Sequence, residues 1–243
     1  MEITPADLGT LAQLFRELAD DICDHWEGND EPSPLLLRKA VLQLFMVLDR
    51  NNPVEYNAAR ETLLPEEVNE LGDYGIKLLQ EMSAFAADLG LHQTAENMED
   101  LAWPFAVWLS RQDCEINTLE PVVNALARKA NTLGENQLLK QLFGQANEII
   151  EAINPQISQD IESSNPMRPW RILIINRAII ATRSHDTELM TRAFDALIDI
   201  LPSDAPQFFE EGVEQMDLLN YPEHVKQLMQ QYFLLHNANH ILH

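Results

Sequence analysis

Glycine is scarce in this chain, and no segment shows the alternation of polar and apolar residues that is typical of a β-strand. The 243 residues include 8 glycines and 13 prolines. Several prolines follow residues that cap helices, at positions 5, 34, 53, 166 and 206. Proline lacks the N–H that would be unpaired in the first helical turn, so this pattern marks helix starts. The sequence therefore predicts an all-α protein.

Cysteine is also rare, and no apolar run reaches the roughly 18 to 20 residues that a membrane span needs. Cys23 and Cys114 are far apart and belong to no paired motif, which fits a reducing compartment. The first residues form neither a basic nor an apolar signal region. At 46% hydrophobic residues, the chain can bury a core without disulfides. We expect a soluble, cytoplasmic protein.

Basic residues are few compared with acidic ones. Sixteen Lys and Arg stand against 39 Asp and Glu, for a net charge of −23. Such a molecule repels DNA, RNA and anionic membrane surfaces, so we expect neither a nucleic-acid nor a membrane partner. The acids are densest at Asp20, Asp21, Asp24, Glu27, Asp30 and Glu31. A solvated helix end explains this patch better than a docking site for a basic partner.

Familiar catalytic and cofactor motifs are missing, among them Gly-x-Gly-x-x-Gly, the phosphate loop, His-Glu-x-x-His and Glu-x-x-His. We therefore predict no cofactor. His236 and His240 lie four residues apart, a helical spacing that could chelate zinc or nickel. We favour the simpler interpretation, in which histidines near a helix C-terminus interact with the helix dipole. Asp21 with His25 is read as a helix-surface contact.

Apolar residues recur at three and four residues along most of the chain, which predicts amphipathic helices. The expected ranges are 5–27, 34–49, 53–61, 65–89, 93–111, 119–133, 136–152, 156–163, 167–183, 186–201, 204–219 and 222–237. We expect a kink or break at Pro104 and consider Gly72 a second candidate. Trp103 and Trp108 flank Pro104 and are expected in the core.

Two adjacent segments differ in their patterns. Between Trp170 and Ala181 almost every residue is apolar, so this helix needs cover on more than one side. Between Asp186 and Leu201 the apolar residues share one face, which predicts a one-sided helix. Because the loop between them is short, we expect a helical hairpin.

Four turn regions share a spacing. Gly90, Gly134, Ser184 and Asn220 each precede a small or aliphatic residue by five positions. Together with Phe143 and Ala146, this pattern resembles a degenerate tetratricopeptide repeat over residues 73–237. The Trp, Leu-Gly and Tyr of the first repeat helix are missing. The resemblance implies an array of stacked antiparallel helical hairpins (an α-α superhelix) over residues 63–243, preceded by an N-terminal helical cap or subdomain over residues 1–62.

The resemblance also implies which residues face the concave groove. Carried over by register from the turns, these are Lys77, Gln80, Asn124, Arg128, Asn131 and Arg171, with Gln207, Glu210, Glu214 and Asp217 in the last pair. Arginine offers a forked donor to carboxylates, so we expect a carboxylate-bearing peptide segment or protein C-terminus to bind there. An alternative stays open, in which the arginines pair with acids on adjacent helices.

The leading functional interpretation is a non-enzymatic adaptor or scaffold that binds another protein. The rival interpretation is a helical enzyme or metal-binding protein whose site assembles from distant His, Asp and Glu residues. Self-association is a third, because Tyr232, Phe233, Leu234 and Leu235 are consecutive and leave the last helix apolar on all sides. A homodimer through this helix would cover it.

Overall fold

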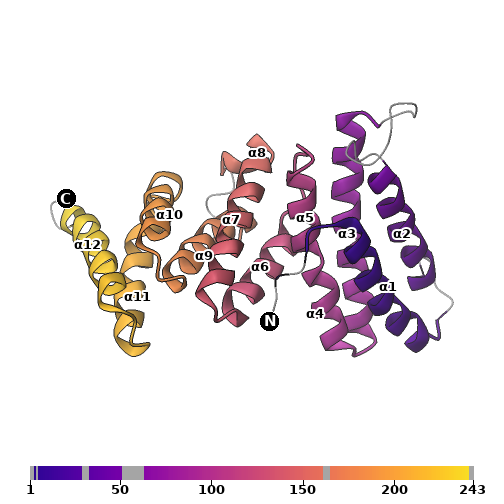
Figure 1. The fold of residues 1–243 in the computed structure, drawn as a ribbon, viewed down its shortest axis with the longest axis horizontal. Helices are drawn as coiled ribbons and strands as arrows, with labels where there is room; N and C mark the ends of the chain where they lie inside the picture. The colour runs from indigo at the N-terminus through magenta and orange to yellow at the C-terminus, as the bar shows by residue number, and fades with distance from the viewer. Residues whose placement is uncertain (1–2, 4, 29–32, 51–62, 161–164, 241–243) are drawn as a thin grey trace. The chain divides into compact units, whose positions relative to one another are not determined.

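The computed structural model is helical over the residues it describes, which are all except 1–2, 4, 29–32, 51–62, 161–164 and 241–243 (Figure 1). The helices are α1 (Leu8–His25), α2 (Pro34–Arg50), α3 (Pro65–Asp88), α4 (His92–Asp100), α5 (Ala102–Ser110), α6 (Glu120–Thr132), α7 (Asn136–Ala152), α8 (Pro155–Ser158), α9 (Pro169–Arg183), α10 (Thr187–Ile200), α11 (Ala205–Leu218) and α12 (Glu223–His240). Within these residues no strand forms, and Ile116 and Ile153 make an isolated parallel bridge. The all-α class is confirmed, and the helix predicted over 53–61 lies outside the described residues.

The chain divides into two compact units. Residues 2–128 and 147–161 form the N-terminal unit, and residues 129–146 and 162–243 form the C-terminal unit. Helices α6 and α7 each supply residues to both. Helices α1 and α2 pack on each other and on α3 within the N-terminal unit. This unit therefore runs across the boundary expected at residue 62, and a distinct role for residues 1–62 stays a prediction.

Helix α5 is the centre of the N-terminal unit. Every residue from Leu101 to Leu109 is buried, and α1, α3 and α4 pack around the helix. Trp103 is fully buried and Trp108 is 7% exposed, so both belong to the core as predicted. The ring of Phe105 meets that of Phe45 edge to face at 5.2 Å between centroids. This cluster fixes how α2 and α5 lie against each other.

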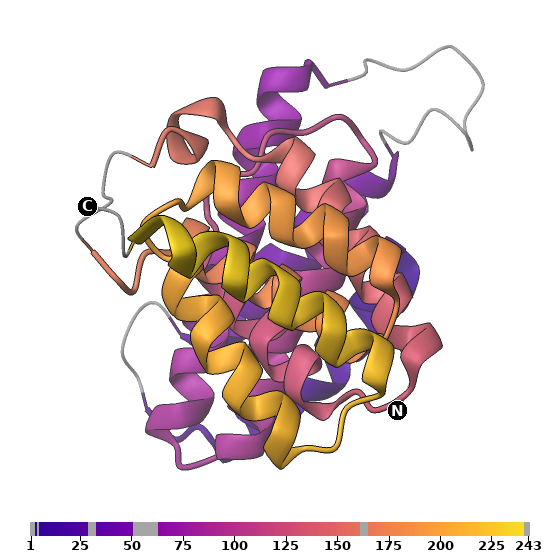
Figure 2. The same cartoon turned by 90° about the vertical axis from the view of Figure 1, so that its left-hand side faces the viewer.

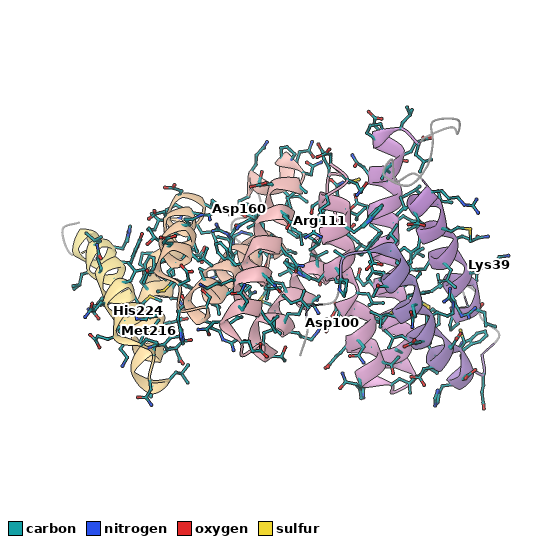
Figure 3. All side chains as sticks on the ribbon, viewed as in Figure 1. Lys39, Asp100, Arg111, Asp160, Met216 and His224 are labelled. Atoms are coloured by element: carbon teal, nitrogen blue, oxygen red, sulfur yellow. The ribbon has the colours of Figure 1, made fainter. Side chains whose placement is uncertain are left out.

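The break predicted near Pro104 is present. Helix α4 ends at Asp100 and α5 begins at Ala102, so the interruption falls at Leu101. Proline cannot donate a hydrogen bond to the carbonyl four residues earlier, and its ring would clash with that carbonyl, which belongs to Asp100. The break leaves the side chains of Glu99 and Asp100 at the end of α4, where Figure 3 labels Asp100.

The second candidate break, at Gly72, is wrong. Helix α3 continues from Pro65 to Asp88 without interruption. A Cβ atom at Gly72 would lie 2.7 Å from Cδ2 of Leu109, and one at Gly75 would lie 2.7 Å from Cε1 of Phe105. These glycines allow α3 to approach α5 closely, which is a packing role that a helix-breaking propensity does not reveal.

Helices α9 to α12 make up most of the C-terminal unit. Helix α9 buries residues around its whole circumference, whereas α10 buries one face with Met190, Ala193, Phe194 and Leu197, so both predicted patterns are confirmed. Helix α9 packs on α10, and α12 packs on α10 and α11, as Figure 2 shows for the last three helices. Phe194 contacts Phe209 and Tyr232 edge to face in their core.

Three helix ends share one turn geometry. Gly90, His185 and Asn220 have φ angles of 78°, 57° and 52°, in the left-handed region. At each, the amide at this residue or the next donates to a carbonyl in the last helical turn. This C-terminal cap reverses the chain sharply and suits glycine or asparagine best. In the third predicted turn the left-handed residue is His185, one position after Ser184. None of the described helices is long and apolar enough to cross a membrane.

Candidate functional site

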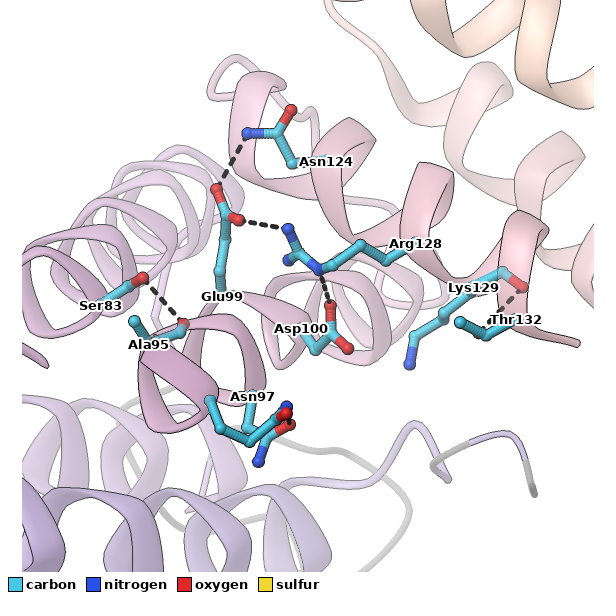
Figure 4. A network of polar contacts seen from close by, with 10 residues as sticks. Ser83, Ala95, Asn97, Glu99, Asp100, Asn124, Arg128, Lys129 and Thr132 are labelled. Atoms are coloured by element: carbon cyan, nitrogen blue, oxygen red, sulfur yellow. Dashed lines mark hydrogen bonds and ion pairs between the residues drawn. The ribbon is translucent and has the colours of Figure 1, made fainter. Parts of the chain in front are cut away.

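Asn124 and Arg128, two of the predicted groove residues, take part in a carboxylate network within the N-terminal unit (Figure 4). Nε of Arg128 donates to Oδ1 of Asp100 at 2.7 Å, and Nη1 donates to Oε2 of Glu99 at 2.7 Å. Nδ2 of Asn124 donates to Oε1 of the same glutamate at 2.9 Å. Asn124 and Arg128 are four residues apart, so they share the face of α6 that meets the end of α4.

This network pairs Nε and Nη1 of Arg128 with carboxylates from within the chain. Burial opposes the charged form, but hydrogen bonds and Coulomb attraction from Asp100 and Glu99 outweigh it and raise the pKa of Arg128. The Glu99 side chain is 18% exposed, so the ion pair is partly shielded from water. An incoming carboxylate would have to displace these two internal carboxylates before it could bind.

Arg171 is engaged in the same way in the C-terminal unit. Its Nε lies 2.7 Å from Oδ1 of Asp204, which stands immediately before α11, and its Nη1 donates to the carbonyl of Pro166 at 3.1 Å. Arg168 lies 3.8 Å from the other oxygen of Asp204. Arg128 and Arg171 therefore both form ion pairs with acids from other parts of the chain. This is the alternative that the sequence left open.

The remaining predicted groove residues lie on exposed or half-buried positions. Lys77 is exposed and Gln80 half-buried on α3, and Asn131 is exposed on α6. Lys77, Gln80, Asn124 and Arg128 belong to the N-terminal unit, whereas Asn131 and Arg171 belong to the C-terminal unit. Peptide binding in a groove that all six residues line stays a prediction.

A different pair of arginines in the C-terminal unit shares one aromatic ring. The guanidinium carbon of Arg177, on α9, lies 4.7 Å from the centroid of Phe143, on α7. The guanidinium carbon of Arg192, on α10, lies 6.0 Å from the same centroid. Arg177 and Phe143 are buried and Arg192 is exposed. We call Phe143, Arg177 and Arg192 the arginine–phenylalanine cluster.

The electrostatics of this cluster differ from those at Arg128. Burial, followed by repulsion from Arg192, lowers the pKa of Arg177 to about 10. Among the described residues Arg192 makes no ion pair and no hydrogen bond through its side chain. Glu188 lies four residues before Arg192 on α10 and Asp195 three residues after it, so both are close enough to compete for it, and Asp195 already accepts a hydrogen bond from Tyr232. Arg192 therefore presents a positive charge at the surface that no acid of the described residues pairs with.

The basic residues beside the cluster have internal partners. Nζ of Lys140, one turn before Phe143, lies 2.6 Å from Oδ2 of Asp186. Nη2 of Arg183 donates to the carbonyl of Leu133 at 2.8 Å. Among these described basic residues, Arg192 is therefore the one that is exposed and makes no ion pair.

A cleft of about 380 Å³ lies in the N-terminal unit beside the loop after α5. Its lining residues are Ser110, Arg111, Asp113, Cys114, Glu115, Glu148, Glu151, Ala152, Ile153 and Pro155. Arg111 and Glu148 face each other with two hydrogen bonds, of 2.6 and 3.2 Å. The loop is held from α3, where Oδ1 of Asp73 accepts from the amides of Asn117 and Thr118, each at 2.9 Å.

The chemistry of this cleft does not favour a thiol nucleophile. Burial, with a smaller contribution from Asp113, raises the pKa of Cys114 to about 11, so its thiol is protonated at neutral pH. The guanidinium of Arg111 donates hydrogen bonds to Glu148, and this interaction raises the pKa of Arg111. The cleft thus holds one ion pair and further carboxylates, but no activated nucleophile among the side chains that line it.

Of the two histidines predicted as a possible metal pair, the structure describes the side chain of His236 only. His236 stacks on the ring of Phe209 with 5.6 Å between centroids, whereas the side chain of His240 lies outside the described residues. No group of three or more His, Cys, Asp or Glu side chains within the described part of the chain is arranged to hold a metal ion.

Helix α12 covers part of its apolar surface within its own unit. Tyr232 is 9% exposed, and its hydroxyl donates to Oδ1 of Asp195 at 2.6 Å. Phe233 is half-buried. Leu234 and Leu235 are 58% and 56% exposed, so the apolar run predicted to need cover has two of its four residues on the open face.

Arg177 and Arg192 are not among the groove residues expected from the sequence, which did not connect either of them to Phe143. A signal was present, because Arg177 interrupts the otherwise apolar run of α9 and a buried guanidinium often stacks on an aromatic ring. The comparisons with protein-family models, curated proteins and solved structures give no match for this chain.

Proposed function

We propose that this protein is a non-enzymatic adaptor that binds a carboxylate-bearing segment of another protein at the arginine–phenylalanine cluster. The supporting observation is that Arg177 and Arg192 lie over the same Phe143 ring, at 4.7 and 6.0 Å from its centroid. The proposal keeps the class of function and of partner expected from the sequence. It moves the principal anchor from Arg128 and Arg171 to Arg192, which makes no ion pair among the described residues and shares the Phe143 ring with Arg177.

A carboxylate suits this pair for a physical reason. Arg177 is 7% exposed, and its charged form is disfavoured by burial and by Arg192. An anion placed against both guanidinium groups offsets this repulsion and accepts hydrogen bonds from their planar forks. Contact with the Phe143 ring restricts the guanidinium of Arg177, which lowers the entropy cost of binding.

The charge of the whole protein adds specificity. With a net charge of −23, the chain repels acidic segments over most of its surface, so an acidic segment binds only where a local positive site overcomes this repulsion. The stacked-hairpin arrangement that resembles tetratricopeptide repeats belongs to the same proposal, because helical hairpin arrays present extended surfaces to peptides.

Selection from a random peptide library on the intact protein tests this function. We expect the selected peptides to be enriched in Asp and Glu, and substitution of their acids by the corresponding amides to weaken binding at least tenfold. Arg192→Glu should abolish capture, and Glu188→Gln, which removes a competing acid, should strengthen it.

Arg16→Glu is the matched control, because Arg16 is exposed on α1 in the other unit. It changes the net charge by the same amount and should leave binding within twofold. Peptides without acid enrichment, or equal binding by Arg192→Glu and wild type, would reject the proposal.

Self-association through α12 is a second candidate function. Leu234 and Leu235 are exposed on a helix face whose other open residues include Gln227, Gln230 and Gln231. Amides and leucines can meet their own copies across a two-fold axis without charge repulsion. Sedimentation equilibrium of wild type and of a Leu234→Ser, Leu235→Ser variant tests it, and a concentration-independent monomer for wild type would exclude it.

A further inference from the structure

Helix α2 has two apolar faces, and the described residues cover only one of them. Leu37, Val41, Leu44, Phe45 and Leu48 are buried, and α2 packs on α1 and α3 through this side. On the other side Leu36, Met46 and Val47 are 52%, 50% and 41% exposed. Large apolar side chains that gather on one open helix face mark interaction sites more often than single exposed residues do.

The open face forms a regular stripe, which we call the α2 stripe. Its residues are Leu36, Lys39, Gln43, Met46, Val47 and Arg50, which recur at three or four positions except for the adjacent pair Met46 and Val47. This spacing aligns them along one side of the helix over about 21 Å, at 1.5 Å per residue. Ridges at this spacing accept a second helix that lies alongside the first.

The charge of the α2 stripe is opposite to that of the molecule. It contains Lys39 and Arg50 and no acid, although the chain carries 39 acidic residues. Lys39 is exposed, extends away from the ribbon in Figure 3, and makes no ion pair within the described residues. The third base of the helix, Arg38, points elsewhere, since its Nε lies 2.7 Å from Oδ1 of Asp20 on α1.

We propose that the α2 stripe docks an acidic amphipathic helix from a partner protein. The apolar side chains of Leu36, Met46 and Val47 supply buried contact, and Met46 adapts its shape to the partner. Lys39 and Arg50, separated by three helical turns, pair with carboxylates that flank the partner's apolar stripe. This charge complementarity selects an acidic helix over a neutral or basic one.

Other occupants fit the stripe less well. An apolar and basic helix face can lie on an anionic membrane, but the net charge of −23 repels such a surface. A second copy of this chain brings the same negative charge. The inference stands apart from the arginine–phenylalanine cluster, which lies in the other compact unit.

A synthetic stapled helix tests the inference on the full-length protein. The probe carries leucines at i, i+3, i+4 and i+7 with flanking glutamates, and two control peptides replace the glutamates by glutamine or lysine. Fluorescence anisotropy should show at least tenfold tighter binding of the glutamate peptide than of either control. Equal binding of the three peptides would overturn the inference.

Variants separate charge from apolar contact. The double variant Lys39→Glu, Arg50→Glu should bind the glutamate peptide at least tenfold more weakly than wild type does, and should bind the lysine peptide more tightly. The double variant Met46→Ser, Val47→Ser should bind all three peptides more weakly than wild type does. Arg16→Glu, an exposed control on α1, should leave binding unchanged. All substituted side chains in the stripe are exposed, so circular dichroism should confirm an intact fold.

Two further outcomes would assign the stripe to another occupant and overturn the proposal. The first is concentration-dependent dimerisation of the free protein that Met46→Ser with Val47→Ser abolishes. The second is binding to vesicles of phosphatidylcholine and phosphatidylglycerol that Lys39→Glu with Arg50→Glu abolishes, in the absence of any preference for the glutamate peptide.

Discussion

The guanidinium of Arg177 stacks on the ring of Phe143, 4.7 Å from its centroid, while the exposed Arg192 approaches the same ring. Arg128 has internal carboxylates at 2.7 Å, and so has Arg171. Arg192 makes no such ion pair among the described residues, which is why the proposed function assigns the ligand to Arg192 and a structural role to Arg128 and Arg171.

Arg128→Met should lower the free energy of unfolding by about 1–2 kcal/mol, because it leaves the half-buried carboxylates of Glu99 and Asp100 without their donor. Adding Glu99→Gln and Asp100→Asn should recover part of this loss. Urea titrations followed by circular dichroism measure both. The Arg128→Met variant should still bind the peptide. If it lost peptide binding while its stability stayed unchanged, Arg128 would be a ligand-binding residue instead.

Gly75→Ala should destabilise the protein by about 1–3 kcal/mol, because a Cβ atom there would lie 2.7 Å from the Phe105 ring and 3.1 Å from Leu44. Gly144→Ala is the matched control on α7, where nothing lies within 4 Å of the added carbon. It should stabilise by up to about 1 kcal/mol through helix propensity. The melting temperatures of both variants test this prediction. Equal changes in melting temperature would contradict close packing of α3 against α5.

His185 gives a pH dependence whose sign follows from its environment. Burial, and then the neighbouring His224, lowers the pKa of His185. The unfolded chain therefore binds more protons below the ordinary histidine pKa of about 6.5, so stability is full above that pH and falls as the pH decreases toward the folded-state pKa. His185→Asn keeps a residue that tolerates the left-handed φ of 57° and should flatten the melting temperature between pH 7.5 and 5.5. An unchanged slope would contradict this assignment.

Thiol labelling tests the rival enzyme interpretation. Cys114 is 4% exposed with its pKa raised to about 11, whereas Cys23 is half-buried. At pH 8 a thiol-specific chromogenic reagent should therefore label the native Cys23→Ser variant at least tenfold more slowly than the Cys114→Ser variant. Rapid labelling of Cys114 would show an activated thiol in the cleft and would favour an enzyme.

Local signals in the sequence predicted the helices well. Of the prolines expected to mark helix starts, Pro34 begins α2 and Pro206 lies in the first turn of α11, where no helical carbonyl needs the missing N–H. Pro104 interrupts the helix because it cannot bond back to Asp100. The nearly continuous apolar sequence of α9 also predicted correctly that this helix is packed on all sides. These features depend on residues within one or two turns of each other.

Partners distant in sequence could not be predicted in this way. The pairing of Arg171 with Asp204, and of Arg128 with Glu99, depends on which helices become neighbours. The packing role of Gly72 depends on Leu109, which comes from another helix. The open face of α2 was missed for a related reason, since its leucines and Met46 look like core residues until the covering helices are known.

A charge-swap titration tests the central claim most directly. An acidic peptide selected on the wild-type protein is titrated by fluorescence anisotropy into wild type and Arg192→Glu, and a second peptide has its acids replaced by arginines. The account predicts that Arg192→Glu loses the acidic peptide at least tenfold and binds the arginine peptide more tightly than wild type does. Equal affinity of wild type and Arg192→Glu for the acidic peptide would contradict it.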